Sequence, residues 1–220
     1  MKESATTQRR SRLNSEVRRK QIVNTAFDVV GARGFEGLRT RDVAALAGIN
    51  SATLHHHFPT KEDLIAGIAA ELAVRFRAER RSDDNRKSER SGGAALADQF
   101  TDVAYYHRER PQMLAVYREL VSRTPRDSVT ATLVKKLHDE WRVGLVEIFH
   151  RGRKDGSLRG DLDPRGAADL VLRAIQGLVT SADVSTSEIK RSLRALEKCL
   201  APVREVPAGM DRDLSQRGRR

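Results

Sequence analysis

Three consecutive histidines, His55 to His57, are the residues whose type first suggests chemistry, either a metal site or a proton-responsive switch. They belong to the stretch SATLHHHFPTKEDL, residues 51–64. Successive residues of a helix point about 100° apart, so three neighbours do not converge on one ion. A chelating pair on a helix needs i and i+4 spacing, and no cysteine or second histidine cluster lies nearby in the sequence. The sequence therefore predicts neither a metal site nor a cofactor here.

Motifs of catalysis and nucleotide binding are not found in the sequence. It contains no Gly-x-x-x-x-Gly-Lys-Ser/Thr phosphate loop and no Gly-x-Ser-x-Gly nucleophile elbow. The carboxylate-rich segment at residues 155–163 lacks the spacing of a calcium-binding hand and is typical of a turn between helices. We therefore expect no enzyme. A helical enzyme or metabolite carrier, which would bind a small molecule but no DNA, is the alternative.

The composition and charge favour a helical protein with a polyanionic partner. Hydrophobic residues make up 39% of the 220 residues and aromatics only 5%, which suits packed helices better than strands. The net charge is +11, and residues 1–61 hold eleven Lys or Arg against five acids, a net of +6. The other 159 residues therefore carry only +5. A concentration of positive charge in the N-terminal part of the chain is expected of a protein that binds nucleic acid.

The sequence also gives an expectation about the cellular compartment. A single cysteine, Cys199, allows no internal disulfide and fits a reducing cytoplasm. The polar, basic N-terminus lacks the apolar core of a signal peptide, and no run of about 18 apolar residues is present. We expect a cytoplasmic protein that does not enter a membrane.

The first elements that must position the histidines are two helices at the basic end of the chain. The first is predicted to begin at Ser15 and to end at Gly31 or Gly34. A short second helix follows Thr40 and ends at Gly48, where a left-handed turn is expected. Four apolar residues of the second helix are expected to face inward: Val43, Ala44, Leu46 and Ala47.

The histidines themselves end a third predicted helix, residues 51–57, which Pro59 prevents from continuing. A fourth helix, about 60–79, opens with the capping box Thr60-x-x-Asp63. Two short helices joined by a glycine turn are the plan of a helix-turn-helix, here at about residues 39–58.

The third helix has the composition of a helix that reads DNA bases. Ser51, Ala52 and Thr53 are small, so the helix can enter the major groove, and the Thr53 methyl suits a thymine methyl. Leu54 and Phe58, four residues apart, are the expected buried anchor. The helix itself has no Lys or Arg, so phosphate contacts are expected from Arg39, Arg41, Lys61 and the arm residues Arg9, Arg10, Arg12, Arg18, Arg19 and Lys20. A purely solubilising role for this arm is the alternative.

Residues 39–68, RTRDVAALAGINSATLHHHFPTKEDLIAGI, resemble the DNA-binding signature of the tetracycline-repressor (TetR) family. Thr, Ala-x-x-Ala-Gly, Leu-aromatic-x-His-Phe and Lys-x-x-Leu follow in order, and the likeness extends over residues 15–75. Residues 155–178 resemble the stretch entering the dimerisation hairpin of that family. The resemblance implies an all-α fold, with an N-terminal three-helix helix-turn-helix DNA-binding domain and a C-terminal helical ligand-binding and dimerisation domain.

The resemblance also implies domain boundaries. They are a basic flexible arm (1–14), the DNA-binding domain (15–75), a connecting helix end with a polar linker (76–93), an effector-binding and dimerisation domain (94–202) and a disordered tail (203–220). Within the second domain, the periodicity predicts helices at about 94–108, 111–122, 127–151, 164–180 and 187–201.

Eight DNA-contacting residues are implied by the resemblance: Thr40, Arg41, Ser51, Ala52, Thr53, His55, His57 and Lys61. Thr40 is expected to cap the second helix and touch a phosphate, and Arg41 to reach a phosphate or a base. His57 and Lys61 are expected to contact the DNA backbone, although His57 packing on the first helix is an alternative. The family has Tyr where this chain has His55. Because imidazole gains a proton near pH 6.5, we hypothesise that DNA binding depends on pH through His55.

The same family plan places an effector pocket after the linker. Large, adaptable side chains line apolar cavities, which makes candidates of Phe100, Tyr105, Met113, Tyr117, Trp141 and Phe149. Arg118, His107 and His138 are candidates to orient a polar group of the ligand. Plain core packing is the alternative for all of them, and the sequence does not identify the effector.

The dimer is expected to form through the last two helices, 164–180 and 187–201, arranged as an antiparallel hairpin. Four small residues allow close helix approach, so two hairpins can form a four-helix bundle: Gly166, Ala167, Ala174 and Gly177. A two-fold dimer presents two reading helices about one DNA turn apart, which predicts an inverted-repeat operator.

These observations together predict a dimeric repressor that a small-molecule effector releases from DNA by tilting the fourth helix. A basic DNA-binding protein without ligand response, or with low sequence specificity, is the alternative. Activation in place of repression also remains open.

Overall fold

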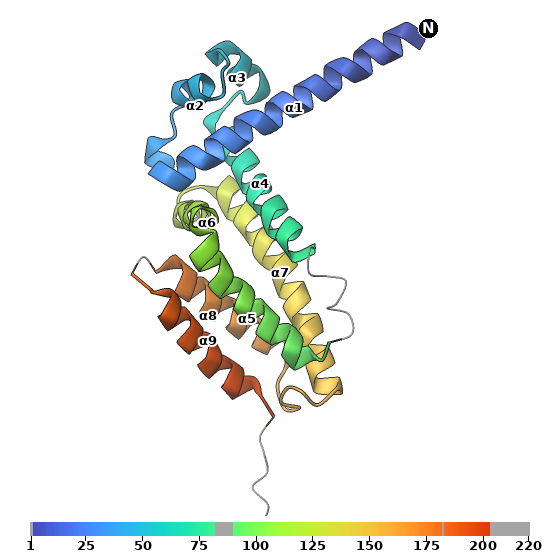
Figure 1. Cartoon of the computed structure of the whole chain (residues 1–220), viewed down its shortest axis with the longest axis vertical. Helices are drawn as coiled ribbons and strands as arrows, with labels where there is room; N and C mark the ends of the chain where they lie inside the picture. The colour runs from blue at the N-terminus through green and yellow to red at the C-terminus, as the bar shows by residue number, and fades with distance from the viewer. Residues whose placement is uncertain (1, 82–89, 182, 203–220) are drawn as a thin grey trace, which may run out of the picture.

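The computed structural model describes residues 2–81, 90–181 and 183–202, and all regular structure in these ranges is helical (Figure 1). The N-terminal elements are α1 (Lys2–Arg33), the 3-10 turn η1 (Phe35–Gly37), α2 (Thr40–Leu46), α3 (Ser51–His57) and α4 (Lys61–Arg81). The C-terminal elements are α5 (Gly92–Glu109), α6 (Pro111–Arg123), α7 (Ser128–Lys154), α8 (Pro164–Thr180) and α9 (Thr186–Leu200). The predicted all-α fold is confirmed.

The N-terminal helices share one core, which fixes α2 and α3 relative to α4. Ala26 and Phe27 of α1 are completely buried, as is Ile68 of α4. Leu54 and Phe58 are 0% and 1% exposed, so the predicted buried anchor of α3 is confirmed. In Figure 1, α1 crosses the upper end of the molecule beside α2 and α3, and α4 descends from them towards the other helices.

Local signals for turns and caps are confirmed. Gly48 ends α2 at φ 65°, a left-handed conformation in which glycine has no steric cost. The N–H of Asp63 donates to Thr60 Oγ1 at 3.0 Å, and the N–H of Thr60 donates to Asp63 Oδ2 at 3.1 Å. A second capping box joins Ser185 and Glu188 at the start of α9.

Two predictions for the N-terminal region are wrong. The flexible arm expected over residues 1–14 is instead, from Lys2 onward, the first part of α1, so Ser15 caps nothing. Residues 2–14 contain neither Gly nor Pro to stop a helix. Leu46 was expected to face inward but is 64% exposed, because α2 is only two turns long and buries one face. The buried residues of that face are Val43, Ala44 and Ala47.

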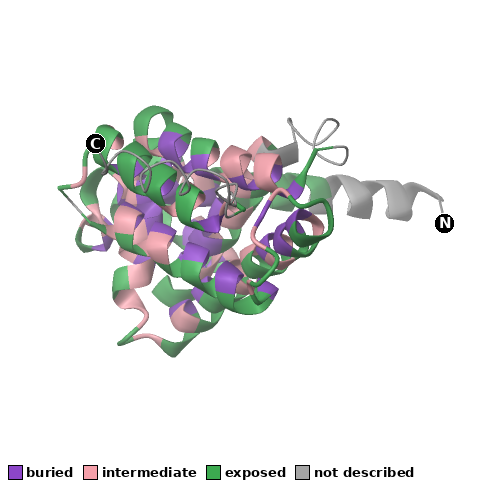
Figure 2. Ribbon diagram, turned by 90° about the horizontal axis from the view of Figure 1, so that it is seen from below, coloured by how far each residue is buried: buried purple, intermediate pink, exposed green. Residues whose placement is uncertain are grey.

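The C-terminal helices form a bundle around α7, which packs against α4, α5, α6 and α8. All five begin and end within three residues of their predicted bounds. Buried residues lie between the helices, and exposed residues cover the outside (Figure 2). The predicted hairpin is looser than expected, since α8 packs chiefly on α7 and α9 chiefly on α5. Their buried residues, such as Val171 and Ile189, therefore serve different neighbours.

The predicted tail at 203–220 and residues 82–89 of the predicted linker segment lie outside the described residues. None of the helices in the described part of the chain combines the length and the apolarity required to cross a bilayer.

Candidate DNA-binding surface and ligand cavity

The first turn of α3 presents small side chains outward. Ser51 and Ala52 are exposed and Thr53 is half-buried. Asn50 caps the helix, since its Oδ1 accepts the N–H of Thr53 at 2.7 Å. This cap was not among the predicted residues, although asparagine is one of the preferred N-cap types. It fixes the start of α3 without adding bulk to the exposed turn.

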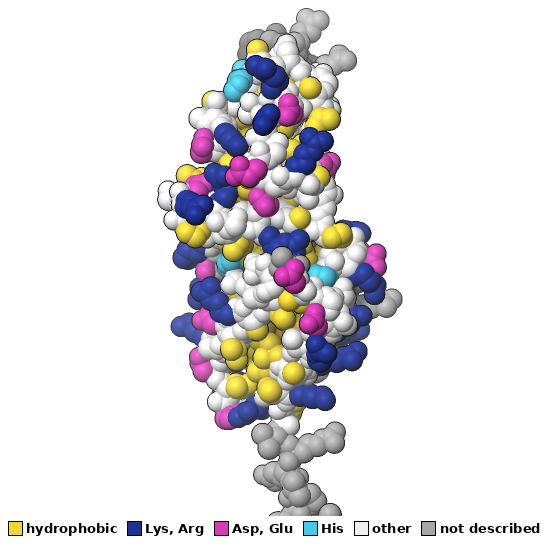
Figure 3. Space-filling model, turned by 90° about the vertical axis from the view of Figure 1, so that its left-hand side faces the viewer, with side chains coloured by type: hydrophobic (Ala, Val, Ile, Leu, Met, Phe, Trp, Pro, Cys, Tyr) yellow, Lys and Arg dark blue, Asp and Glu magenta, His cyan; other side chains and the backbone are white. Residues whose placement is uncertain are grey.

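An open groove runs beside α3, at the start of α2 and of α4. Four of the eight predicted DNA-contacting residues line it: Thr40, Arg41, His55 and Lys61. Arg39 lines it as well, and Asp42 is its one acid, so three permanent cations face one anion. Lys, Arg and His side chains are exposed at this upper end of the molecule (Figure 3). A basic groove next to an exposed helix suits phosphate binding.

Thr40 does not have the expected capping role. Arg39 occupies the N-cap position of α2, and no side chain caps that helix. Thr40 is the first helical residue and lies half-buried in the groove.

His57 differs from His55 in its surroundings. His55 is exposed, whereas His57 is half-buried, with its ring 5.3 Å from the ring of His56. Burial, together with His56, Arg19 and Arg18 nearby, lowers the pKa of His57. The imidazole of His57 is therefore neutral at pH 7 and offers a hydrogen bond, not a charge. The described residues contain no cluster of three or more His, Cys, Asp or Glu side chains that could hold a metal ion.

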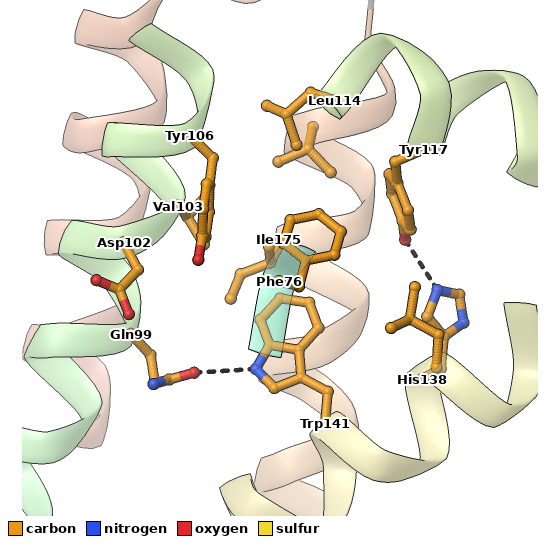
Figure 4. A pocket seen from close by; sticks show the side chains of 12 residues that line it. Phe76, Gln99, Asp102, Val103, Tyr106, Leu114, Tyr117, His138, Trp141 and Ile175 are labelled. Carbon is orange, nitrogen blue, oxygen red and sulfur yellow. Dashed lines mark hydrogen bonds between the residues drawn. The ribbon is translucent and has the colours of Figure 1, made fainter. Parts of the chain in front are cut away.

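A cavity of about 60 Å³ lies between α4, α5, α6, α7 and α8 (Figure 4). Of the six predicted ligand-binding residues, Tyr117 and Trp141 line it. Phe100, Met113 and Phe149 are buried but do not line it. The sixth, Tyr105, is 37% exposed and does not line it either. Helical periodicity identifies a buried face but does not separate a cavity wall from plain core.

The polar residues expected to orient a ligand are divided in the same way. His138 lines the cavity. His107 bonds instead to Thr186, with 2.8 Å between Nδ1 and Oγ1, and Arg118 donates to the carbonyl of Val179 at 3.4 Å. The other nine of the twelve lining residues were not predicted to line a cavity; the polar and aromatic ones among them are Phe76, Gln99, Asp102 and Tyr106. Their helical spacing resembles that of any core residue, so no signal distinguished them.

Four of the polar side chains that line the cavity form two hydrogen-bonded pairs. Tyr117 Oη lies 2.9 Å from His138 Nε2, and Trp141 Nε1 donates to Gln99 Oε1 at 3.1 Å. Burial raises the pKa of Tyr117. Burial and, to a lesser extent, Arg173 lower the pKa of His138. Both members of that pair are therefore neutral at pH 7, so the cavity combines an aromatic wall with these neutral hydrogen-bonding groups and the carboxyl group of Asp102.

Helix α6 joins this cavity to the N-terminal helices. Its residue Gln112 donates to Asp28 Oδ1 of α1 at 3.2 Å, and a Cβ on Gly31 would lie 2.3 Å from the Gln112 Cγ. Near the end of α6, the guanidinium of Arg123 lies 5.0 Å from the ring centre of Phe35. Since α6 also contributes cavity-lining residues, it contacts both the cavity and the N-terminal helices.

Comparison with known proteins agrees with this geometry. The model of the family "Bacterial regulatory proteins, tetR family" matches residues 22–68. The HTH-type transcriptional repressor KstR2 of Mycobacterium tuberculosis is 30% identical over 166 residues, which cover 72% of this chain and 76% of the relative. Solved TetR-family regulators from Haloarcula marismortui (TM-score 0.75, 19% identity) and Agrobacterium tumefaciens (0.73, 17%) share the fold. These matches cover 84% and 85% of this chain, respectively, and 99% of each neighbour.

Proposed function

Because this chain belongs to the TetR family of bacterial regulatory proteins, we propose that it is a dimeric repressor, released from an inverted-repeat operator by a small molecule. The family consists of DNA-binding transcriptional regulators, so the chain is a regulator and not an enzyme. Repression is proposed over activation because the relative KstR2 is a repressor. The DNA-binding domain comprises α1–α4, the effector-binding and dimerisation domain comprises α5–α9, and the protein acts in the cytoplasm.

The observation that carries the DNA-binding role is the small, exposed first turn of α3 beside a basic groove. Ser51, Ala52 and Thr53 face the base edges, where small side chains allow close approach. The groove residues Thr40, Arg41, His55 and Lys61 contact the phosphates on either side. His57, being half-buried and neutral, adds one hydrogen bond to the DNA backbone.

Exposed apolar and small residues on α8 and α9 support the dimer. Leu170, in the middle of α8, is 56% exposed, and Gly177, Ala195 and Cys199 are exposed on these two helices. Figure 3 shows hydrophobic side chains gathered on the lower part of the face on which α8 and α9 lie. Burying such a surface gains about 25 cal/mol per Å². A two-fold axis buries the same patch on both subunits and points two α3 helices at one operator.

The size of the cavity supports a mechanism of release. Ligand pockets usually measure about 300–1,000 Å³, whereas this cavity holds about 60 Å³. An effector must therefore push the walls apart. One wall residue, Phe76, belongs to α4, which continues unbroken to Lys61 next to the groove. Displacement of Phe76 tilts α4 and moves α3, and a differential affinity of about 1–3 kcal/mol between the two states is enough for release.

Selection of bound duplexes from a random DNA pool tests this proposal. The purified protein is expected to enrich an inverted repeat with half-sites about 10–10.5 base pairs apart, or a multiple of that spacing. A pool that stays random would favour a basic protein that coats DNA without reading its sequence.

A further inference from the structure

Arg19 of α1 is bound to the C-terminal end of the reading helix. Its Nη1 donates to the carbonyl oxygen of His57, the last residue of α3, at 2.7 Å. Its guanidinium carbon also lies 4.1 Å from the ring centre of Phe58. The last carbonyls of a helix have no partner within the helix, and a cation there meets the negative end of the helix dipole. Arg19 therefore supplies a hydrogen-bond donor and a positive charge to the C-terminal end of α3.

A second contact from the same turn of α1 holds the end of α2. Gln21 Nε2 donates to the carbonyl of Ala47, the C-cap residue of α2, at 2.9 Å. The other end of this amide, Oε1, accepts from Arg18 Nη1 at 2.9 Å, which fixes the orientation of Gln21. Each of α2 and α3 is seven residues long, too short to be stable alone, so its direction depends on such contacts.

We propose that Arg19 is a positioning residue for sequence reading, which sets the direction of α3 and does not neutralise a DNA phosphate. The proposal rests on the proposed DNA-reading function. One of the five N–H donors of Arg19 is engaged by the His57 carbonyl, and its guanidinium lies over the ring of Phe58, which is only 1% exposed and anchors α3. The sequence had grouped Arg19 with the basic arm as a phosphate contact; the geometry points to a different role.

Lys20 provides a matched control. It is the next residue of α1, is also exposed, and makes no hydrogen bond or ion pair within the described part of the chain. Arg19→Gln and Lys20→Gln thus remove the same charge from the same turn, but only the first removes the contact to α3. Arg19→Lys keeps the charge and loses the planar group that covers Phe58.

The test compares the affinities of these three variants for the duplex that the wild type selects and for a shuffled duplex of equal length. Lys20→Gln is expected to weaken both complexes alike. Arg19→Gln is expected to lower the ratio of the two affinities by about tenfold, a loss of the size seen when one base contact fails. Arg19→Lys should keep wild-type affinity for the shuffled duplex. Its ratio of selected to shuffled affinity should fall between those of the wild type and Arg19→Gln. Equal ratios in Arg19→Gln, Lys20→Gln and the wild type would overturn the proposal.

The salt dependence gives a second readout. A phosphate contact adds about 0.9 to the slope of log K against log salt. Arg19→Gln is expected to keep the wild-type slope, and a decrease of about one would identify Arg19 as a phosphate contact and overturn the proposal.

Amide hydrogen exchange in the free protein separates this proposal from the DNA-binding function. The α3 amides are expected to exchange faster in Arg19→Gln than in Lys20→Gln, and equal rates would overturn the positioning role. If the wild type selects no DNA sequence, the proposed function fails, and the exchange rates alone decide whether Arg19 holds α3.

Discussion

The carboxylate of Glu119, on α6, accepts a hydrogen bond of 2.8 Å from the backbone N–H of Phe35, in the turn between α1 and α2. Phe35 is 4% exposed, so its N–H depends on this one protein acceptor. The bond ties a helix that lines the cavity to the domain that carries α3. It gives the cavity a second connection to the domain that carries the proposed DNA-binding surface, beside the continuous helix α4.

Replacing Glu119 with alanine is expected to lower the free energy of unfolding by about 1–3 kcal/mol, the cost of a buried donor left without its partner. The control is Glu36→Ala, which removes an exposed carboxylate next to Phe35. A surface change of that kind is expected to stay within about 0.5 kcal/mol. Urea unfolding measures both. Equal effects of the two substitutions would show that the hydrogen bond between Glu119 and Phe35 does not stabilise the fold.

A negative charge in the first turn of α3 is expected to weaken DNA binding without unfolding the protein. Ala52→Glu should lower the operator affinity by roughly 10- to 100-fold, corresponding to the 1–3 kcal/mol that a lost base contact costs. Ala52 is exposed, so the fold tolerates the change. Thr132→Glu adds the same charge at an exposed position of α7 and serves as the control. Fluorescence anisotropy on the selected duplex measures both, and comparable losses would contradict base reading by α3.

Breaking the apolar face of α8 is expected to separate the dimer. Leu170→Asp places a carboxylate in the proposed interface, whereas Val143→Asp does the same at a 59% exposed position of α7. Sedimentation equilibrium should find a monomer for Leu170→Asp and a dimer for the wild type and Val143→Asp. Dimerisation of Leu170→Asp at wild-type strength would place the interface elsewhere.

The stability of the fold is expected to fall in mild acid, in part through His138. Because the folded protein lowers the pKa of His138, the unfolded chain binds a proton there at a pH at which the folded chain does not. The free energy of unfolding therefore falls as the pH drops below about 6.5, the ordinary value for histidine. His138→Gln removes this contribution, so its stability should fall less between pH 7.5 and 5.5 than that of the wild type. Unfolding in urea at both pH values measures the difference, and equal slopes would contradict the burial of a neutral His138.

The sequence predicted those parts of the fold that local chemistry decides. Gly48 marks the left-handed turn, Thr60 and Asp63 form their capping box, and Leu54 with Phe58 anchors α3. In each case the signal lies within a few residues and needs no knowledge of the neighbouring helices. The groove residues Thr40, Arg41, His55 and Lys61 were instead expected from the resemblance to the TetR family.

Features that depend on contacts between distant segments were not predicted. Leu46 has the type and spacing of a core residue, but no helix in the described part of the chain covers its face of α2. Phe76 and Tyr106 meet with ring centres 5.2 Å apart only because α4 and α5 both pack against α7 at the cavity. Arg19 was predicted to contact a phosphate because of its charge. Its partner in the structure, the carbonyl of His57, lies 38 residues away in the sequence.

The measurement that tests the central claim most directly is the affinity of the purified wild-type protein for its selected duplex and for a shuffled duplex, at one near-physiological salt concentration. A regulator that reads bases with the first turn of α3 is predicted to bind the selected duplex about a thousandfold more tightly, or more. A ratio near one would contradict sequence reading and leave only the attraction between a basic surface and DNA.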